Sequence, residues 1–531
     1  MLIQRNYLAQ FISPLALLGA FVSILATAAP ASETNAPPST KVSDPLLDLF
    51  IKKGYVTQQE AEQVRAEAEA MQSTNTLPTS SKWKFGGNIK DVELYGDLRF
   101  RYEERSVHTS LGDRFELDRL RYALRLGLRG DLRSDFYYGL RLETSSNPRS
   151  PWVTFGTSSS GVPYNGPSGK STAGINLGQL YLGWKPSSWF DATVGKMPQP
   201  LYVTPMLWDT DINPEGLVER FKYPIGPADF FANFGQFIYQ DVNPDRSTPF
   251  LSTPTDLNGR DTSGIFLLSW QGGVTYHFNK DTFLKAAGTI YNYTGQGPTN
   301  SPAGFGNAFV GASTITPGSP VVGSSGYPGG RNDGFIFNQT GINDLLVLDF
   351  PFELDFKLAH QRVKVFGDFA ENLDGSQRAA AATASGGSAL LNNSGGYSVT
   401  IPYQPKDNRA YQAGVAIGGG EDLGLVYGGG SREPSLRRNS WEFRAYWQHV
   451  EQYALDPNLI DSDFFEGRGN MEGVYSAFAY GFTDAVIATI RFGYATRINP
   501  NLGTGGSNQD IPQVNPLKNY ELIQLDLTMR F

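Results

Sequence analysis

The sequence predicts an all-β protein, a transmembrane antiparallel β-barrel of sixteen strands preceded by a short helical segment. From about residue 91 to the C-terminus, successive runs alternate apolar and polar side chains with a period of two, as β-strands do. Short turns between these runs alternate with long loops rich in Gly, Ser, Pro and Asn, the pattern of periplasmic turns and outer loops. The mean hydropathy of -0.31 argues against a bundle of membrane helices, and 13% aromatic residues suit strands with interfacial rings.

Residues 1–31 are predicted to be a secretory signal peptide. Arg5 precedes a mostly apolar run over 11–29, and the small residues that follow offer cleavage after Ala28 or Ala31. An uncleaved membrane anchor is the alternative, but polar and helix-breaking residues dilute the run. No other stretch is long and apolar enough to form a spanning helix, so a mature chain in a membrane must span it with strands.

Residues 32–84 are predicted to be a linker and a short periplasmic helical segment. Pro45 begins a first helix and Gly54 ends it, and Thr57 with Glu60 forms a capping box for a second helix that runs to about Met71. The second helix has few apolar positions. We expect the pair to pack on itself or on a neighbouring subunit, or to form a solvated stalk.

Residues 85–531 are predicted to form the barrel. The runs interpreted as strands lie near 91–104, 117–130, 138–143, 175–185, 189–197, 217–223, 228–240, 263–279, 282–294, 344–356, 362–371, 408–418, 440–451, 471–481, 485–497 and 520–531. Their number is even, as a single-chain barrel with both ends in the periplasm requires. The connection 419–439 is unusually long for its side of the barrel, and Pro351 indicates either a bulge in the tenth strand or a different strand boundary there. The loops 300–340 and 379–398 are interpreted as low-complexity surface segments, and the alanine run in the second has no period long enough to require a helix.

Arginines dominate the polar face of the first three strands. In a barrel the apolar face of a strand meets lipid and the polar face meets the lumen. The sequence therefore predicts a basic wall lining the pore, made of Arg99, Arg101, Arg121, Arg125, Arg129 and Arg141. Local pairing with Asp97, Glu103 or Glu143 is the alternative role of these side chains. Inward Asp349, Glu353 and Asp355 add negative charge elsewhere.

The last strand reads YELIQLDLTMRF and ends on an aromatic residue. Its apolar face carries the side chains of Ile523, Leu525, Leu527, Met529 and Phe531. This ending resembles that of outer-membrane β-barrel proteins, in which the terminal Phe and the alternating apolar residues form the signal read by the barrel-assembly machinery. The resemblance implies a barrel in outer-membrane lipid, with Asp526 and Arg530 as further candidate pore-lining residues.

The segment 195–219 concentrates acidic residues in what is the third long loop by our count. The segment resembles the third loop of sixteen-stranded porins, and this resemblance implies that the loop narrows the pore through Trp208, Asp209, Asp211, Asn213, Glu215 and Glu219. The spacing of Asp209, Asp211 and Asn213 also matches the start of a calcium-binding loop. However, Pro214 and Arg220 stand where such a loop requires Gly and a bidentate Glu. We therefore predict no metal and no cofactor, and keep Ca²⁺ as a weaker alternative.

The chain as a whole resembles the putative porin family of Gram-negative outer membranes. The resemblance rests on the signal peptide, the helical preface LLxLxxKKGxVTxxEA, the loop WDxDxNPEG and the terminal Phe strand. It implies passive diffusion of small hydrophilic solutes and ions through a water-filled channel, by a homotrimer in the outer membrane. It also implies a third loop folded into the barrel. Acids on that loop, facing the arginine wall, would set a transverse field across the pore.

Other classes of function are less compatible with the residues. The formal charge is -8 and no basic tract stands out, so nucleic acid is not an expected partner. With no cysteine there is no Cys nucleophile. A barrel hydrolase is one alternative, although none of His108, His277, His360 and His449 adjoins a recognisable Ser/Asp pattern. An adhesin or structural barrel is the other, and conductance would distinguish it from a porin. We expect no enzymatic activity.

Overall fold

A computed structural model describes residues 86–531, apart from 110–113, 146–149, 157–173, 241–264, 295–330, 333–344, 385–388, 392–397, 401–406, 420–435, 457–458, 501–503, 505–510, 512–513 and 516. The chain divides into two compact units, Met1–Lys84 and Phe85–Phe531. The first unit lies outside the described residues, and so do the predicted signal peptide, linker and helical preface.

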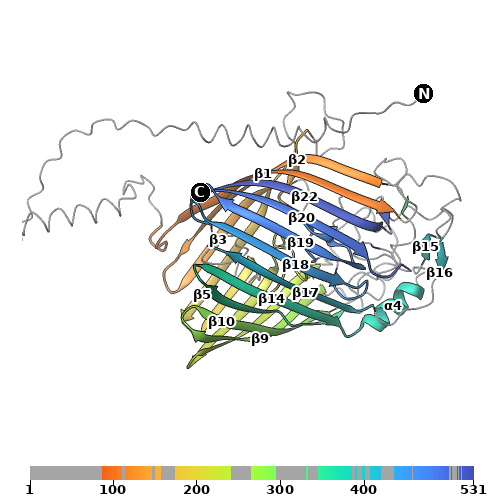
Figure 1. Ribbon diagram of the computed structural model, residues 1–531. Coiled ribbons are helices and arrows are strands. Elements are labelled where there is room, and N and C mark those ends of the chain that lie inside the picture. Colours follow the sequence, from red (N-terminus) through yellow and green to blue (C-terminus); the bar gives the residue numbers. More distant parts are fainter. Residues whose placement is uncertain are drawn as a thin grey trace, which may run out of the picture. The chain divides into compact units, whose positions relative to one another are not determined.

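The second unit is a closed antiparallel β-barrel of sixteen strands (Figure 1). In order around the wall, the strands are β1 (Glu93–Thr109), β2 (Arg114–Asp131), β3 (Phe136–Ser145), β5 (Gly174–Ser187), β6 (Phe190–Lys196), β7 (Glu215–Ile225), β8 (Ala228–Gln240), β9 (Ile265–Asn279), β10 (Thr282–Thr294), β12 (Leu346–Asp349) with β13 (Phe352–Leu358), β14 (Gln361–Asn372), β17 (Arg409–Gly418), β18 (Trp441–Val450), β19 (Met471–Gly481), β20 (Val486–Arg497) and β22 (Leu517–Arg530). Antiparallel pairing of β1 with β22 closes the ring, from Asp97↔Arg530 to Thr109↔Leu517. The predicted fold and strand number are thereby confirmed.

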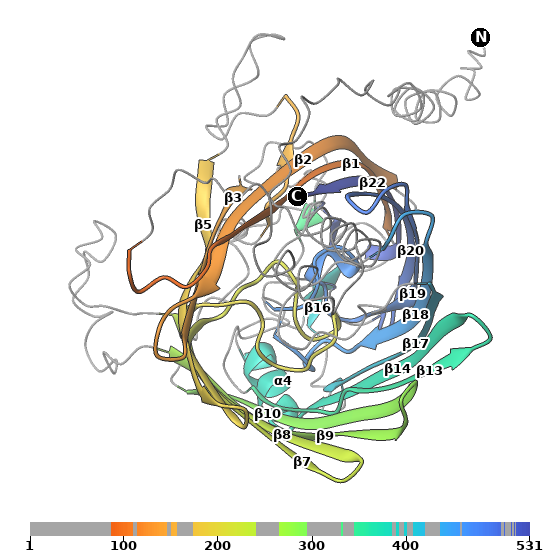
Figure 2. The same cartoon turned by 90° about the vertical axis from the view of Figure 1, so that its left-hand side faces the viewer.

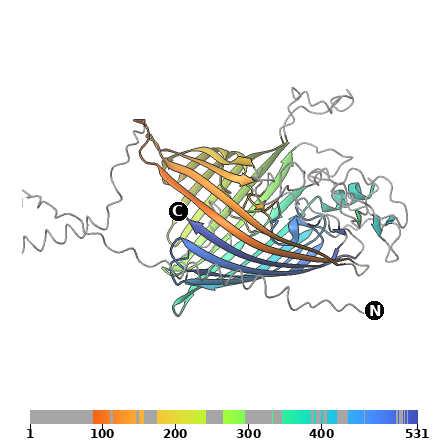
Figure 3. The same cartoon turned by 90° about the horizontal axis from the view of Figure 1, so that it is seen from above.

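Short turns gather at one end of the barrel and long connections at the other. The C-terminus lies at the end with the short turns, whereas β15 (Ala389–Leu391), β16 (Ser398–Thr400) and α4 (Gly375–Ala384) lie at the opposite end (Figure 1). The strands run obliquely to the barrel axis, as closure of a sheet requires (Figure 3). The long connection 419–439 falls mostly outside the described residues.

The tenth strand differs from the prediction of a bulge at Pro351. The strand is interrupted between β12 and β13, but both parts pair with β10 in one register, since Asp349 faces Thr289 and Phe352 faces Ala286. No extra residue is inserted, so the bulge prediction is wrong. Pro351 lacks an N–H donor, yet its carbonyl still accepts a hydrogen bond from the Ala287 amide at 3.0 Å, and the wall stays continuous.

The apolar faces of the strands point outward. Leu124, Leu126 and Leu128 of β2 are 38%, 41% and 37% exposed, whereas Arg121 and Arg125 of the same strand are buried inside the wall. The last strand follows the same rule, with Met529 outward and Asp526 inward. Alternation thus places the apolar side chains toward lipid and the polar ones toward the lumen.

Smaller elements complete the described chain. They are β4 (Val153–Thr154), β11 (Arg331–Asn332), β21 (Val514–Asn515) and the 3₁₀ turn η5 (Phe465–Gly467). Helix α4 begins before the alanine run and includes part of it, where the sequence did not require a helix. Its start is held by long-range packing, because Ala379 is buried against Tyr453. Among the described residues, no helix has the length and apolarity to cross a bilayer.

Candidate functional site: a loop across the barrel lumen

The third long loop, residues 197–214 between β6 and β7, lies inside the ring of strands (Figure 2). The Met197 amide donates to the Pro214 carbonyl at 2.9 Å, which draws the two ends of the loop together. The loop side chains Leu201, Val203 and Met206 are fully buried, in a cluster that also contains Phe237 of β8 and Leu267 of β9. An apolar core therefore holds the loop inside a barrel whose wall residues are largely polar.

One side of the loop is anchored to β9 and β14. The Gln271 side chain on β9 accepts from the Tyr202 amide at 2.9 Å and donates to the Tyr202 carbonyl at 2.8 Å. Both main-chain groups of Tyr202 are thus satisfied although the residue is buried. Two residues further on, the Thr204 hydroxyl donates to the Asp368 carboxylate of β14.

The other side of the loop is anchored to β2 and β5. Asp211 forms an ion pair with Arg125 of β2, and Asn213 accepts a hydrogen bond from Gln179 of β5 at 2.9 Å. Strand β2 is the seventh strand after β14 in a ring of sixteen. The strands between them are β17, β18, β19, β20, β22 and β1. The loop therefore spans the lumen from one wall almost to the opposite one.

A second connection meets the third long loop inside the barrel. This seventh long loop, residues 451–470, joins β18 to β19, and Phe464 and Phe465 in it are buried. The Asp209 carboxylate accepts from the Ser462 amide at 3.0 Å and from the Ser462 hydroxyl at 2.7 Å. The Asp461 amide also donates to the Pro205 carbonyl at 3.2 Å. The two loops thus hold each other in place.

The contact between the loops brings together three acidic groups, of which Asp209 is buried and Asp461 and Asp463 are partly exposed. Burial raises the pKa of Asp209 to about 7, with a further contribution from the neighbouring Asp211 charge, although hydrogen bonds from the Asp211 amide and Ser462 oppose the shift. Burial and the charge of Asp209 likewise raise the pKa of Asp461 well above its ordinary value. For Asp463, burial is outweighed by the charges of Arg101 and Arg491, which lower its pKa. The junction between the loops is therefore sensitive to pH near neutrality.

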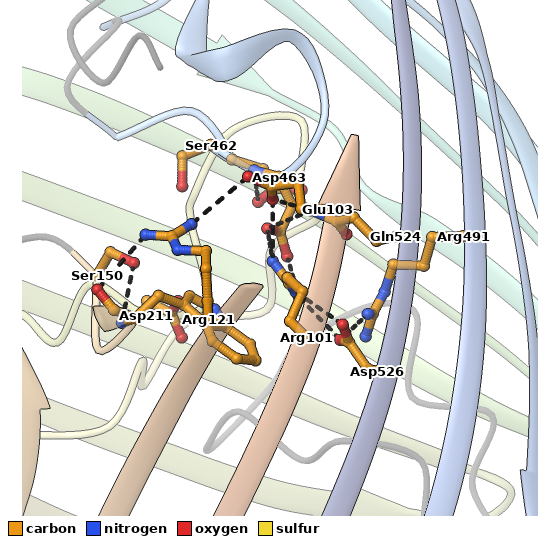
Figure 4. A network of polar contacts seen from close by, with 12 residues as sticks. Arg101, Glu103, Arg121, Ser150, Asp211, Ser462, Asp463, Arg491, Gln524 and Asp526 are labelled. Carbon is orange, nitrogen blue, oxygen red and sulfur yellow. Dashed lines mark hydrogen bonds and ion pairs between the residues drawn. The ribbon is translucent and has the colours of Figure 1, made fainter. Parts of the chain in front are cut away.

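Arg101 of β1 connects the wall to the seventh long loop. Its guanidinium lies between Asp463 of the loop, at 2.6 Å, and Asp526 of β22, at 2.8 Å (Figure 4). Arg491 of β20 also pairs with Asp526, and the ring of Trp152 lies 4.1 Å from the Arg101 guanidinium carbon. Arg101 is 2% exposed, so its charge is neutralised by carboxylates rather than by water.

The other predicted wall arginines are also paired. Arg99 contacts Asp97 at 2.6 Å, and Arg141 contacts Glu143 at 3.1 Å. The Arg121 guanidinium lies 3.8 Å from Glu103, which also accepts from Arg105, Arg119 and Gln524. Arg129 differs from the rest, because it is half-exposed near the end of β2 and pairs with Glu93 at 2.6 Å.

Two residues assigned to the constriction lie outside the third long loop. Glu215 is the first residue of β7, where it pairs with Lys196 at 2.5 Å and is more than half exposed. Glu219 lies further along β7, on the same face as the outward Leu217, and accepts a hydrogen bond from Gln236 at 2.9 Å. Their assignment to the inward loop is wrong, because the strand begins at 215 and alternation turns Glu219 away from the lumen. Trp208, Asp209, Asp211 and Asn213 do lie within the loop.

The predicted calcium ligands are engaged by protein donors. Asp209 accepts from Ser462 and from the Asp211 amide, Asp211 pairs with Arg125, and Asn213 accepts from Gln179. Across the part of the chain that the structure describes, no group of three or more His, Asp or Glu residues is arranged to hold a metal ion.

Sequence reasoning missed the seventh long loop and its charged residues. Asp463 and Glu466 enter the lumen from that loop, and Arg491 comes from the inward face of β20. The acid-rich segment DSDFFEG at 461–467 resembles the third loop in composition, which is the signal that could have identified it.

A closed barrel with an apolar outer face, a polar inner face and inward-folded loops defines a membrane channel of the porin class. Residues 111–316 match the model of the family described as putative porin, which confirms the resemblance stated above. The matched part includes the third long loop and covers less than half of the chain. This match and the closed barrel together support an outer-membrane porin channel.

Several solved structures are similar to this chain at low sequence identity. The anion-selective porin from Comamonas acidovorans is 8% identical, with 83% of this chain and 99% of that chain covered and a TM-score of 0.39. The outer membrane channel DcaP of Acinetobacter baumannii is 12% identical, with 85% and 99% covered and a TM-score of 0.38. OmpF of Salmonella typhi is 9% identical, with 84% and 98% covered and a TM-score of 0.39. No curated protein sequence matches the chain.

Proposed function

We propose that the channel passes small hydrophilic solutes and ions by passive diffusion, and that the third long loop sets its narrowest part. The observation that carries this proposal is the course of the loop across the lumen, from Asp368 on β14 to Arg125 on β2. A loop tied at both walls and packed through an apolar core keeps a fixed shape, so the size limit for solutes is a property of the folded protein. No catalytic step is part of this function.

The charges at this narrow part act at short range. Each arginine of the wall has a carboxylate close by, so the transverse field of the wall is weaker than the arginines alone would create. The side chains of Asp463 and Asp211 remain 34% and 16% exposed and are the acids available to solutes. We propose that they face solutes on one side and the arginines on the other, which orients dipolar solutes with only modest ion selectivity.

Conductance with solute-size exclusion tests the proposal. The purified protein is inserted into planar bilayers and into liposomes, and ion currents and the entry of neutral sugars of increasing size are measured. Stable channels with a size cutoff support the proposal, whereas absence of conductance would favour an adhesin or structural barrel.

Reversal of the basic wall tests the route of the ions. The double variant Arg121→Glu and Arg125→Glu is expected to shift the reversal potential toward cation preference, because two positive charges beside the loop become negative. An unchanged reversal potential would remove both residues from the conduction path. The matched control is Arg133→Glu in a periplasmic turn, which should leave the potential unchanged.

We also propose that the protein forms a homotrimer and is inserted by the barrel-assembly machinery through Ile523, Leu525, Leu527, Met529 and Phe531. Insertion through this segment is supported by the outward direction of its apolar side chains in β22, where Ile523, Met529 and Phe531 are 38%, 42% and 54% exposed.

A hydrolase would need a different kind of site from the one described here. The nitrogens of His449 and His277 lie 3.0 Å from Glu472 and 3.6 Å from Asp229, and neither contact involves a serine.

A further inference from the structure

The outer face of β7 and β8 carries a charged residue where the surrounding surface is apolar. Leu217 of β7 and Phe234 of β8 are each 37% exposed, while Val218 and Phe237 are buried in the loop core. Alternation therefore turns Glu219 and Gln236 to the outside of the barrel. The amide of Gln236 donates to the Glu219 carboxylate at 2.9 Å, within the same outer face.

A lipid environment does not explain this pair. Glu219 lies opposite Ala192 of β6 and Phe234 of β8, inside the paired part of both ladders. An ionisable side chain facing the hydrocarbon of a bilayer is destabilising and rare. Among the described residues, the hydrogen bond from the neutral amide of Gln236 leaves most of the acceptor sites of the carboxylate without a donor. The surface is therefore incompletely satisfied when it faces lipid.

Aromatic rings adjoin the pair and form a connected group over five strands. Ring centroids are 6.2 Å apart for Phe136 and Trp184, 6.0 Å for Trp184 and Phe190, 5.2 Å for Phe190 and Phe221, and 5.9 Å for Phe221 and Phe234. A belt of aromatic residues at the membrane surface would account for the rings but not for the carboxylate among them. Aromatic anchors around a polar centre are the composition of a protein–protein interface.

We propose that this outer face of β5, β6, β7 and β8 is the surface through which one copy of the chain packs against a second copy. The same face holds both an acceptor and donors, because the indoles of Trp184 and Trp189 are 42% and 54% exposed, Trp184 opposite the Ala192 that also faces Glu219, and Trp189 against Phe221 of β7. Copies related by rotation can thus supply each other with the missing hydrogen-bond donors, and polar contacts of this kind join proteins within membranes. The inference rests on the proposed porin assembly and identifies its contact face.

Photochemical cross-linking tests the identity of the partner. Phe234 is replaced by photoreactive benzoylphenylalanine, and the matched control carries it at Phe478, which is 42% exposed on the outer face of β19. Irradiation of the protein in its own outer membrane is expected to give an adduct with the mass of two chains at position 234 and none at 478. Adducts with lipid or with a different protein at 234 would overturn the inference, as would equal two-chain adducts at both positions.

Substitution of the charged residue separates an interface from a lipid-facing surface. The variant Glu219→Leu removes the incompletely satisfied polar pair. If this surface faces lipid, the variant barrel should be more stable and the mass of the protein particle in detergent should be unchanged. The proposed interface instead predicts loss of the oligomer, with the control Ser476→Leu on the outer face of β19 remaining assembled. An assembled Glu219→Leu protein would contradict the proposal.

Ion conductance recorded on the same preparations separates this inference from the proposed function. Conducting protein without the two-chain adduct would reject the contact face and leave the channel function standing. Non-conducting protein with the adduct would reject the channel function and leave the contact face standing.

Discussion

We predict that the current through the channel depends on pH, because acidic groups lie at the junction between the third and seventh long loops. Asp209 is 3% exposed, and burial raises its pKa from 3.8 to about 7. The charges of Asp211 and Asp463 add to this shift. Deprotonation therefore places a poorly hydrated negative charge at the contact, and we expect the loops to separate more often as the pH rises through 7.

The magnitude follows from proton linkage. In the released loop the carboxyl regains its ordinary pKa of 3.8 and is ionised throughout the range from pH 6 to 8, whereas the buried form binds a proton with a pKa of about 7. The junction is thus favoured by protonation, and its stability falls as the pH rises. Over two pH units centred on 7, the loss is about 1.4 kcal/mol, or about tenfold in the equilibrium between joined and released loops.

Single-channel recording in planar bilayers measures this equilibrium. We expect brief current fluctuations between two levels to become more frequent from pH 6 to pH 8. In Asp209→Asn, which keeps the shape of the side chain without its charge, the pH dependence should be smaller, and Asp281→Asn in a periplasmic turn serves as the control. Fluctuations that become rarer above pH 7, or an Asp209→Asn channel that titrates like the wild type, would refute this reasoning.

Three further predictions concern the constriction and the barrel. Asp211→Asn removes the ion pair with Arg125, which still has Glu143 at 3.4 Å, so the loop anchor should weaken by about 1–2 kcal/mol and the reversal potential should move toward anion preference. An unchanged potential would place Asp211 away from the ion path. Trp208→Ala empties a site that is 2% exposed and packed against Phe237, at a cost of about 3–5 kcal/mol to loop packing, and should raise the single-channel conductance. Equal conductance in this variant would mean that the loop does not limit the current. The unboiled protein should migrate differently from the boiled protein on a denaturing gel, because closure of β1 onto β22 leaves no edge from which the barrel can unfold easily, and identical migration would count against the closed fold.

Strand positions could be predicted from the sequence because they depend on local periodicity. The strands at 228–240, 282–294 and 471–481 have the bounds that alternation indicated. Each apolar residue at every second position must face lipid, and a shift of one residue would exchange the two faces. Helix α4 was not predicted because its alanine run has no apolar period; the structure shows Ala379 of this helix packed against the distant Tyr453.

The site was only partly predictable. The inward direction of Arg101 and Arg125 follows from the apolar residues beside them on the same strands. The partners of Arg101 do not follow from the sequence, because Asp463 and Asp526 are 362 and 425 residues away from it. Glu219 was misassigned because both faces of β7 mix apolar and charged residues, so its period alone does not say which face meets lipid.

The sequence by itself determined that this chain forms a sixteen-stranded barrel with an arginine-rich inner face and an acidic third loop, since the pleat of each strand converts residue order directly into sidedness. The tertiary structure decided how those charges are used. It brought the third and seventh long loops together at Asp209 and Ser462, paired the arginines with distant carboxylates, and turned Glu219 to the outside. Such contacts depend on how strands and loops meet after the ring has closed, which no short stretch of sequence encodes.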